Sequence, residues 1–152
     1  AFSVAEHSVI VERICRKLDP SLTAKQGLTA LLHDSPEYVI GDMISPFKAL
    51  LGESYKGVEA RLQEAVHIRF GVRATTPAAL KKIIKRADNV CAWFEAVQLA
   101  GFTPAEATGF FGEPPEGWRV KLAPLPPTEA QALFLKRFTE IQAVMAAQES
   151  AR

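Results

Sequence analysis

A chain of 152 residues with 48% hydrophobic and 23% charged side chains has the size and composition of a single globular domain. Its 18 basic and 17 acidic residues give a net charge of +1, so composition offers no reason to expect a nucleic-acid polymer or a membrane as partner, and no apolar run is long enough for a membrane span. The two cysteines, Cys15 and Cys91, exclude a disulfide framework and indicate reduced core thiols in a cytoplasmic protein.

Helix-start signals divide the first part of the chain. Ser3-Val4-Ala5-Glu6 is a capping box, in which the serine hydroxyl and the glutamate carboxylate satisfy amide groups, and it predicts a helix to about Leu18. Thr23-Ala24-Lys25-Gln26 repeats the motif and predicts a second helix towards His33. The pair Ser45-Pro46 then indicates a loop, because proline disfavours helical geometry in the preceding residue.

Two helices are predicted in the middle of the chain. Residues 55–70 carry an apolar face at helical spacing, and Gly71 ends this segment. Thr76 as cap, with Pro77 as the first helical residue, predicts the longest helix over residues 78–100.

The last part of the chain holds two more capping boxes. Thr103 begins a short helix that ends near Gly109, and Thr128 begins the last helix after a proline-rich connection. An apolar stripe on that last helix is either core or the seam of a homodimer, and it comprises Leu133, Phe134, Phe138, Ile141 and Met145. No segment alternates with a period of two, so we predict an all-α fold and one domain over residues 1–152.

The segment LLHDSPEYVIGDMISP, residues 31–46, places ionisable side chains inside an apolar run. Adjacent helical residues point about 100° apart, so His33 and Asp34 can face one ion only near the end of a helix. Ser35 and Pro36 supply that end, because proline stops the helix unless a new turn begins there with Ser35 as its cap. Glu37 would then lie in the first turn of the new segment.

Two neutral imidazoles and two carboxylates suit a divalent transition metal and leave coordination positions for water and substrate. His33 and Asp34 would supply half of this set, and His7 and Asp88, on two other helices, are the natural remainder. Each residue has a plainer interpretation, since a lone histidine on an apolar face is usually core and Asp88 could pair with a neighbouring cation. The four together favour the metal, because buried His and Asp without partners are costly.

These motifs resemble the HD-domain metal-dependent phosphohydrolases, whose signature is H…HD…D. SVAEHS, LLHDSPEYVIGDMISPFK and IKRADN occur in the order of that family, and the GD…P.K extension after HD is the specific part. They look most like the branch with the bacterial 5′-deoxynucleotidases and the phage-type deoxynucleotide triphosphohydrolases. The resemblance is close over residues 3–95 and looser in the W…PLPP…FLKRF tail.

The resemblance implies a role for each matching residue. The metal ligands would be His7, His33, Asp34 and Asp88. Glu37 would orient or deprotonate the attacking water, Asp42 would lie at the deoxyribose and Lys48 near the phosphate. Two aspartates and a divalent cation sum to about zero charge, so other cations must help to bind a phosphate, and Lys85 and Arg86 are near enough in sequence to border the site.

The expected function is that of a 5′-deoxynucleotidase with one divalent ion, which could be Mn, Co, Zn, Fe or Mg, because three histidines are too few for a binuclear site. A dNTP triphosphohydrolase is the alternative substrate assignment, and a non-catalytic, metal-containing nucleotide-binding module is the alternative of another class. The family carries substrate-contacting residues before the SVAEHS segment, so we expect sequence to be missing before Ala1. Pro36 stands where the family commonly has a small non-proline residue.

Three further residues have open interpretations. His67 belongs to no motif and is structural or exposed. Glu95 follows Asp88 by seven residues, hence on the same helix face, where it could support a ligand histidine or form a salt bridge. Trp118, in the proline-rich connection, is the candidate for a lid over the pocket.

Overall fold

The computed structural model describes residues 2–41 and 45–151, without the side chains of residues 45–49 and 53–54. The helices in these residues are α1 (Val4–Leu18), α2 (Ala24–Leu31), α3 (Glu37–Ile40), α4 (Ser45–Arg69), α5 (Ala78–Gln98), α6 (Pro104–Phe111) and α7 (Pro127–Ser150). No strand occurs among the described residues, so the predicted all-α fold class is confirmed. Within the same residues no helix combines the length and apolar character that a bilayer crossing needs.

Three capping boxes form as predicted. At Ser3, Thr23 and Thr103 the side chain accepts a hydrogen bond from the amide three residues on, and the side chain of that residue accepts one in return. Each reciprocal pair satisfies two amides that a helix start would otherwise leave without partners. The starts of α1, α2 and α6 are therefore fixed by local sequence.

Two predicted caps were wrong. Helix α5 begins at Ala78 with Pro77 as its extended N-cap (φ −57°, ψ 144°), so Thr76 lies one residue too early to cap it. Helix α7 begins at Pro127, which places Thr128 inside the first turn, and neither helix has a side-chain cap. Pro126 is extended because it precedes another proline, and this sets the start of α7.

Helix α4 is longer than predicted. It begins at Ser45 rather than near residue 55, so the predicted loop at Ser45-Pro46 is instead a helix start, where proline is well tolerated. Gly52 interrupts it with a non-helical conformation (φ 67°, ψ −154°). Its end agrees with the prediction, because Gly71 has φ 74° and the Val72 amide donates to the His67 carbonyl at 3.0 Å.

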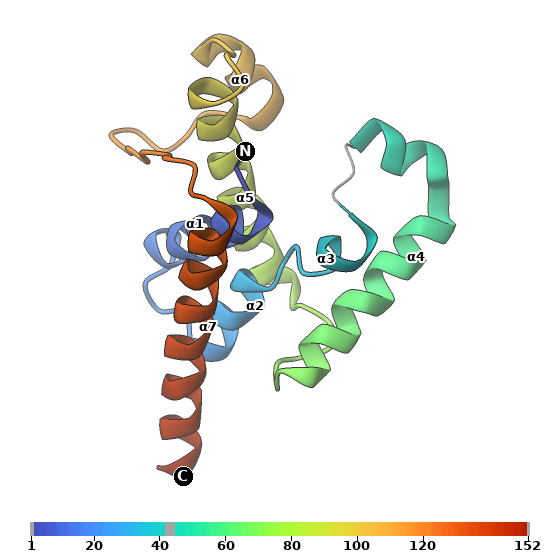
Figure 1. Ribbon diagram of the computed structural model, residues 1–152, viewed down its shortest axis with the longest axis vertical. Coiled ribbons are helices and arrows are strands. Elements are labelled where there is room, and N and C mark those ends of the chain that lie inside the picture. The colour runs from blue at the N-terminus through green and yellow to red at the C-terminus, as the bar shows by residue number, and fades with distance from the viewer. Residues whose placement is uncertain (1, 42–44, 152) are drawn as a thin grey trace.

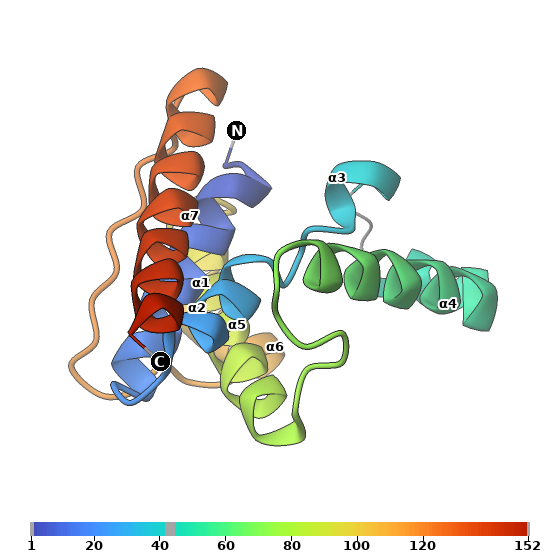
Figure 2. The same ribbon diagram turned by 90° about the horizontal axis from the view of Figure 1, so that it is seen from below.

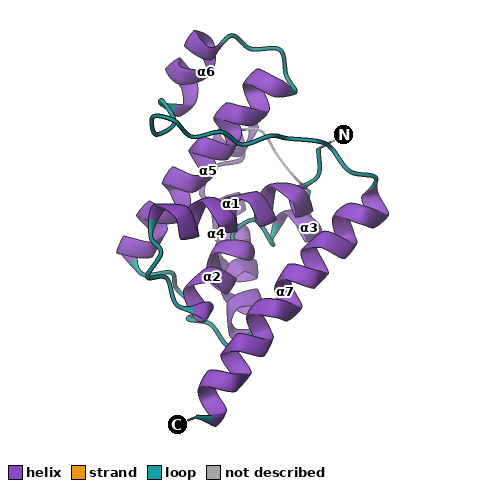
Figure 3. Cartoon of the chain, turned by 90° about the vertical axis from the view of Figure 1, so that its left-hand side faces the viewer, coloured by secondary structure: helices purple, strands orange, loops and turns teal. Residues whose placement is uncertain are grey.

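Helix α1 lies at the centre of the bundle and packs against α2, α5 and α7, while α6 packs on α5. Figures 1 and 2 both show α4 beside this bundle rather than within it. Figure 3 shows the connection after α6 running across α5 to reach α7.

Two apolar clusters form the core. The first joins α1 to α5 around Val11 and Ala87, and the second joins α2 to α7 around Leu28 and Ile141. Both cysteines are free and buried, in agreement with the predicted core thiols. The apolar stripe of α7 belongs to the second cluster, in which Ile141 and Met145 are buried and Leu133, Phe134 and Phe138 are partly buried.

Candidate metal centre

Three separate segments bring the predicted ligands together. His7 lies in the first turns of α1, His33 and Asp34 directly follow α2, and Asp88 is in the middle of α5. The ligand atoms of His7, His33 and Asp88 lie within 4.8 Å of one another. Asp34 Oδ2 is 3.1 Å from His33 Nε2 and 3.5 Å from His7 Nε2. The packing of α1 against α2 and α5 thus assembles one cluster from residues far apart in sequence.

The two histidines present the same nitrogen to this cluster. His33 Nδ1 donates to the Ala30 carbonyl oxygen at 2.9 Å, and His7 Nδ1 lies 2.7 Å from Glu95 Oε1. Because these oxygens accept hydrogen bonds, Nδ1 carries the proton in both rings. Both Nε2 atoms are buried and have no hydrogen-bond partner within the described part of the chain, although carboxylate oxygens lie 3.1–3.5 Å from them.

Asp88 divides its two oxygens between two neighbours. Oδ1 lies 3.3 Å from His7 Nε2, while Oδ2 accepts a hydrogen bond from Lys85 Nζ at 2.8 Å. The salt bridge considered as the plainer role of Asp88 therefore exists, and the oxygen that faces His7 takes no part in it. Glu95, for which both a salt bridge and support of a histidine were open, contacts His7 directly.

The electrostatics of the cluster favour positive charge at its centre. Burial by itself lowers the pKa of His7, but the interactions with Asp88, Cys91 and Glu95 outweigh it and raise that pKa to about 12. Burial acts to raise the pKa of Asp34, yet His33 and His7 lower it overall. The carboxylates are thus held ionised around the histidines.

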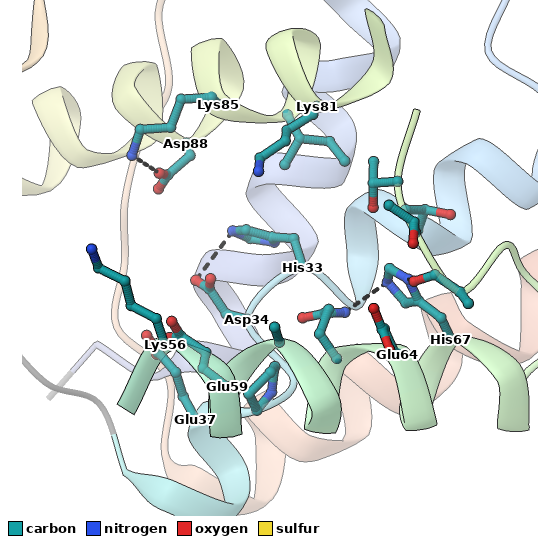
Figure 4. Close-up of a pocket in the computed structure, with 18 residues that line it drawn as sticks. His33, Asp34, Glu37, Lys56, Glu59, Glu64, His67, Lys81, Lys85 and Asp88 are labelled. Atoms are coloured by element: carbon teal, nitrogen blue, oxygen red, sulfur yellow. Dashed lines mark hydrogen bonds and ion pairs between the residues drawn. The ribbon is translucent and has the colours of Figure 1, made fainter. Parts of the chain in front are cut away.

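A cavity of about 550 Å³ opens beside the cluster. Figure 4 shows His33, Asp34 and Asp88 on its walls, with α4 on the side opposite α5. The ionisable residues that line it are His33, Asp34, Glu37, Lys56, Glu59, Glu64, His67, Lys81, Lys85 and Asp88. This volume is in the range of small-ligand sites in proteins.

Glu37 lines this cavity from the first turn of α3, as predicted. Figure 4 shows it on the same side as Asp34, next to Lys56 and Glu59. The predicted cap before it was wrong, because Pro36 occupies the N-cap without a side-chain cap bond. The Ser35 hydroxyl is instead buried, with no hydrogen-bond partner among the described residues.

The residues predicted to contact the substrate lie in different places. Asp42 and the side chain of Lys48 lie outside the described residues. Lys85 lines the cavity and also a second hollow between α5 and the end of α6, whereas Arg86 and Lys82 line only the second hollow. Arg86 is therefore absent from the cavity beside the cluster, although it is adjacent in sequence to Lys85.

Sequence reasoning missed two cations of the cavity, Lys56 and Lys81. Lys81 could have been found, because it precedes Lys85 by four residues and Asp88 by seven, which places all three on one face of α5. Lys56 could not, since its position depends on how α4 lies against the bundle.

Trp118 is not one of the described residues that line this cavity. It packs against the first apolar cluster, and the Lys17 ammonium lies 4.1 Å from its ring centroid. The lid prediction was therefore wrong, because Trp118 packs against the cluster between α1 and α5 instead of lining the cavity.

His67 is structural, as one of the two interpretations held. It is 1% exposed, its Nδ1 donates to the Ala74 carbonyl at 3.0 Å, and its Nε2 accepts from Gln63 at 2.6 Å. The same Gln63 amide donates to the Leu32 carbonyl at 2.9 Å. This pair links α4 to the end of α2 and to the segment before α5, and so closes one side of the cavity.

The donor set fits a divalent metal. Two buried imidazole nitrogens without partners and two carboxylates form a borderline N2O2 set of the kind that zinc, manganese, iron and cobalt occupy. The residues of the cluster could therefore hold a metal ion, and the identity of the ion is open.

Fold and site together define an all-helical protein with a candidate metal centre at a small-ligand cavity. No protein-family model matches the sequence. The chain is 48% identical over 141 residues to a protein of Rhodobacter capsulatus named only as uncharacterized, and the match covers 90% of this chain and 71% of that protein. The chain belongs to the same family as this R. capsulatus protein. That name states no activity, so function rests on the site.

Proposed function

We propose that this protein is a metal-dependent phosphohydrolase of the HD-domain type, and that its substrate is a deoxynucleoside 5′-monophosphate, which it cleaves to deoxynucleoside and phosphate. The observation that supports the proposal is the pair of buried, unpartnered Nε2 atoms of His7 and His33, which face two carboxylates at the wall of a cavity. The order of the H…HD…D motifs supports the same family.

His7, His33, Asp34 and Asp88 would hold one divalent ion. Such an ion supplies Lewis-acid polarisation of a phosphoryl oxygen and lowers the pKa of water from about 15.7 towards 7. The protein fixes the imidazoles through their Nδ1 atoms and Asp88 through Lys85, so the ligand atoms are held before any ion binds.

The charges of the cavity suit a substrate with few phosphates. Lys56, Lys81 and Lys85 line it together with the carboxylates of Asp34, Glu37, Glu59, Glu64 and Asp88. Once a divalent cation is added, the formal charge of this lining is close to zero. A phosphate monoester would then be held chiefly by local contacts, with Lys85 at the metal side of the cavity.

Glu37 is the candidate general base. It lines the same cavity as His33, Asp34 and Asp88, and a carboxylate can take or steer the proton of an attacking water molecule if it is within hydrogen-bond reach. The leaving group in this reaction is the nucleoside 5′-oxygen, which takes up a proton as the phosphorus–oxygen bond breaks.

A dNTP triphosphohydrolase is the second candidate. Lys81 lies one helical turn from Lys85 in the same cavity, about 6 Å further along α5. Two cations in a row could hold successive phosphates of a longer chain, and this is the observation that favours a triphosphate.

The products distinguish these candidates. Metal-stripped protein would be supplied with Mn²⁺, Co²⁺, Zn²⁺ or Mg²⁺ and incubated with deoxy- and ribonucleoside mono- and triphosphates. We expect metal-dependent release of orthophosphate from deoxymonophosphates. Release of tripolyphosphate from a dNTP would replace the first candidate with the second. If the protein binds metal but hydrolyses none of these nucleotides, the result would favour the non-catalytic nucleotide-binding module.

The Glu37→Gln variant tests the role of the base. General-base removal typically costs about 10²- to 10⁴-fold in turnover, and we expect kcat to fall by that factor while metal content stays unchanged. Glu116→Gln, a change at an exposed carboxylate of the proline-rich connection, is the matched control. Full activity in Glu37→Gln would remove Glu37 from the mechanism.

A further inference from the structure

We infer that Glu95, itself held by Cys91, is a positioning residue that fixes the ring of His7 for metal binding. This inference rests on the proposed metal centre. It concerns the affinity for the ion and not the identity of the substrate.

One helix holds both nitrogens of the His7 ring. Glu95 Oε1 lies 2.7 Å from Nδ1, and Asp88 Oδ1 lies 3.3 Å from Nε2, although His7 itself comes from α1. Glu95 and Asp88 are seven residues apart on α5, which puts both carboxylates on the face that packs against α1. The orientation of the imidazole is thus set by α5 at both ends.

Cys91 stabilises Glu95 in this position. Its thiol donates to Glu95 Oε1 at 3.1 Å, and its side chain is fully buried in the first apolar cluster. The same carboxylate oxygen therefore receives the Nδ1–H of His7 and the S–H of Cys91. Two donors on one oxygen leave Glu95 little freedom to turn away.

The consequence is a defined tautomer for His7 when an ion takes the place of its Nε2 proton. A proton on Nδ1 leaves the Nε2 lone pair directed at the other ligands, and a carboxylate partner increases the basicity of the imidazole. The second ligand histidine has a different support, because His33 Nδ1 donates to the backbone carbonyl of Ala30. The partner of His7 is a side chain, which a substitution can remove, whereas the partner of His33 is a backbone carbonyl, which a substitution leaves in place. The effect of the partner can therefore be tested at His7.

A rival arrangement uses the same atoms. His7 Nδ1, Cys91 Sγ and a Glu95 oxygen also lie close enough to hold an ion themselves. An ion there would displace the Nδ1 proton and the thiol proton, and it would leave the Nε2 atoms of both histidines unpartnered. The four-ligand site accounts for those nitrogens, so we favour it, and the two sites differ in whether sulfur contacts the metal.

The experiment compares metal affinities of stripped, folded protein by competition with a chelator, with Zn²⁺ and Co²⁺ as probes. Loss of such a supporting partner typically weakens metal binding about 10- to 100-fold, and we expect this for Glu95→Ala. Glu95→Gln should lose less, because its amide oxygen can still accept from Nδ1. Glu116→Gln, which removes one negative charge at an exposed position of the proline-rich connection, is the matched control and should keep the affinity of the parent.

Two further readouts separate positioning from a merely structural role. Long-range ¹H–¹⁵N correlations should show His7 protonated at Nδ1 in the zinc-loaded parent, and a changed or mixed tautomer in Glu95→Ala. The metal-induced rise in Tm should shrink in that variant by more than its metal-free Tm changes. A thiolate-to-cobalt charge-transfer band that Cys91→Ser abolishes would instead establish the sulfur-containing site and overturn the inference.

Unchanged metal affinity and tautomer in Glu95→Ala would also overturn it, as would a parent protein that binds neither probe ion. Failure of the proposed function gives a different pattern. In that case no nucleotide is hydrolysed, while the parent still binds metal and Glu95→Ala still binds it more weakly.

Discussion

Gly27 of α2 faces a buried ion network on α1. Glu12 is fully buried, Arg16 pairs with it, and Arg137 of α7 donates to both of its oxygens at 2.9 Å. A Cβ at position 27 would overlap the Arg16 guanidinium and lie 3.2 Å from Glu12 Oε1. The close contacts are therefore with the charged ends of two side chains, and the Arg16 guanidinium must move before a larger residue fits.

Gly27→Ala should destabilise the protein, because it pushes Arg16 away from a buried carboxylate. Overpacking of this kind costs about 1–3 kcal/mol of unfolding free energy. Gly57→Ala is the control, since Gly57 is also helical and no heavy atom lies within 4 Å of its built Cβ. That change should stabilise by about 0.5–1 kcal/mol. Urea unfolding measures both, and shifts of equal sign and size would refute the steric explanation.

Residue by residue, the sequence predicts the candidate ligands better than their surroundings. His7, His33, Asp34 and Asp88 were found from order and residue type, and they come together in space. Contacts that depend on the angle between two helices were not found, such as Lys56 on α4. Arg86 was assigned by its closeness in sequence to Asp88, but it lines a second hollow and not the cavity beside the cluster.

At the scale of elements, the helices that begin with a side-chain cap were predicted correctly, and the first residues of the helices that follow a proline were not. Ser3, Thr23 and Thr103 each use hydrogen bonds within four residues, so local sequence determines them. Near Pro77 and Pro126 the backbone conformation of the proline decides where the helix begins. The early start of α4 was missed because Ser45-Pro46 reads equally well as a loop and as a helix N-terminus.

The proline-rich connection is an element held by side chains. The Gln98 amide at the end of α5 donates to the Val120 carbonyl at 2.7 Å and accepts from the Leu122 amide at 3.0 Å. The Leu125 amide donates to the buried Glu6 carboxylate at 2.9 Å. These contacts replace the backbone partners that a strand would have supplied.

Gln98→Ala should therefore loosen this connection. It removes hydrogen bonds at a partly exposed site, each of which typically contributes about 0.5–1.5 kcal/mol. Gln131→Ala, at an exposed position of α7, is the comparison and should change stability by less than about 0.5 kcal/mol. Hydrogen exchange of the Leu122 amide reports the local effect. If its protection is the same in both variants, Gln98 does not hold the connection.

At the scale of the whole molecule, the candidate metal centre joins elements that the apolar core holds only in part. His7 comes from α1, His33 and Asp34 from the segment between α2 and α3, and Asp88 from α5. Helix α1 packs against α2, α5 and α7, and α2 also packs against α7, but the segment after α2 leads out to α3 and α4 beside the bundle. An ion held by all four residues would tie that segment to the core.

Metal should consequently raise the stability of the entire domain. A ligand at 100 times its Kd adds about 2.7 kcal/mol, and in a domain of this size 1 kcal/mol shifts Tm by about 2–4 °C, so we expect a rise of roughly 5–11 °C. Thermal unfolding of stripped protein with and without Zn²⁺, Mn²⁺ or Co²⁺ measures it. Asp88→Asn weakens one ligand and should lose most of this gain. A Tm that no ion changes in the parent protein, at saturating concentrations, would show that the cluster is an ion-pair network formed by the side chains alone.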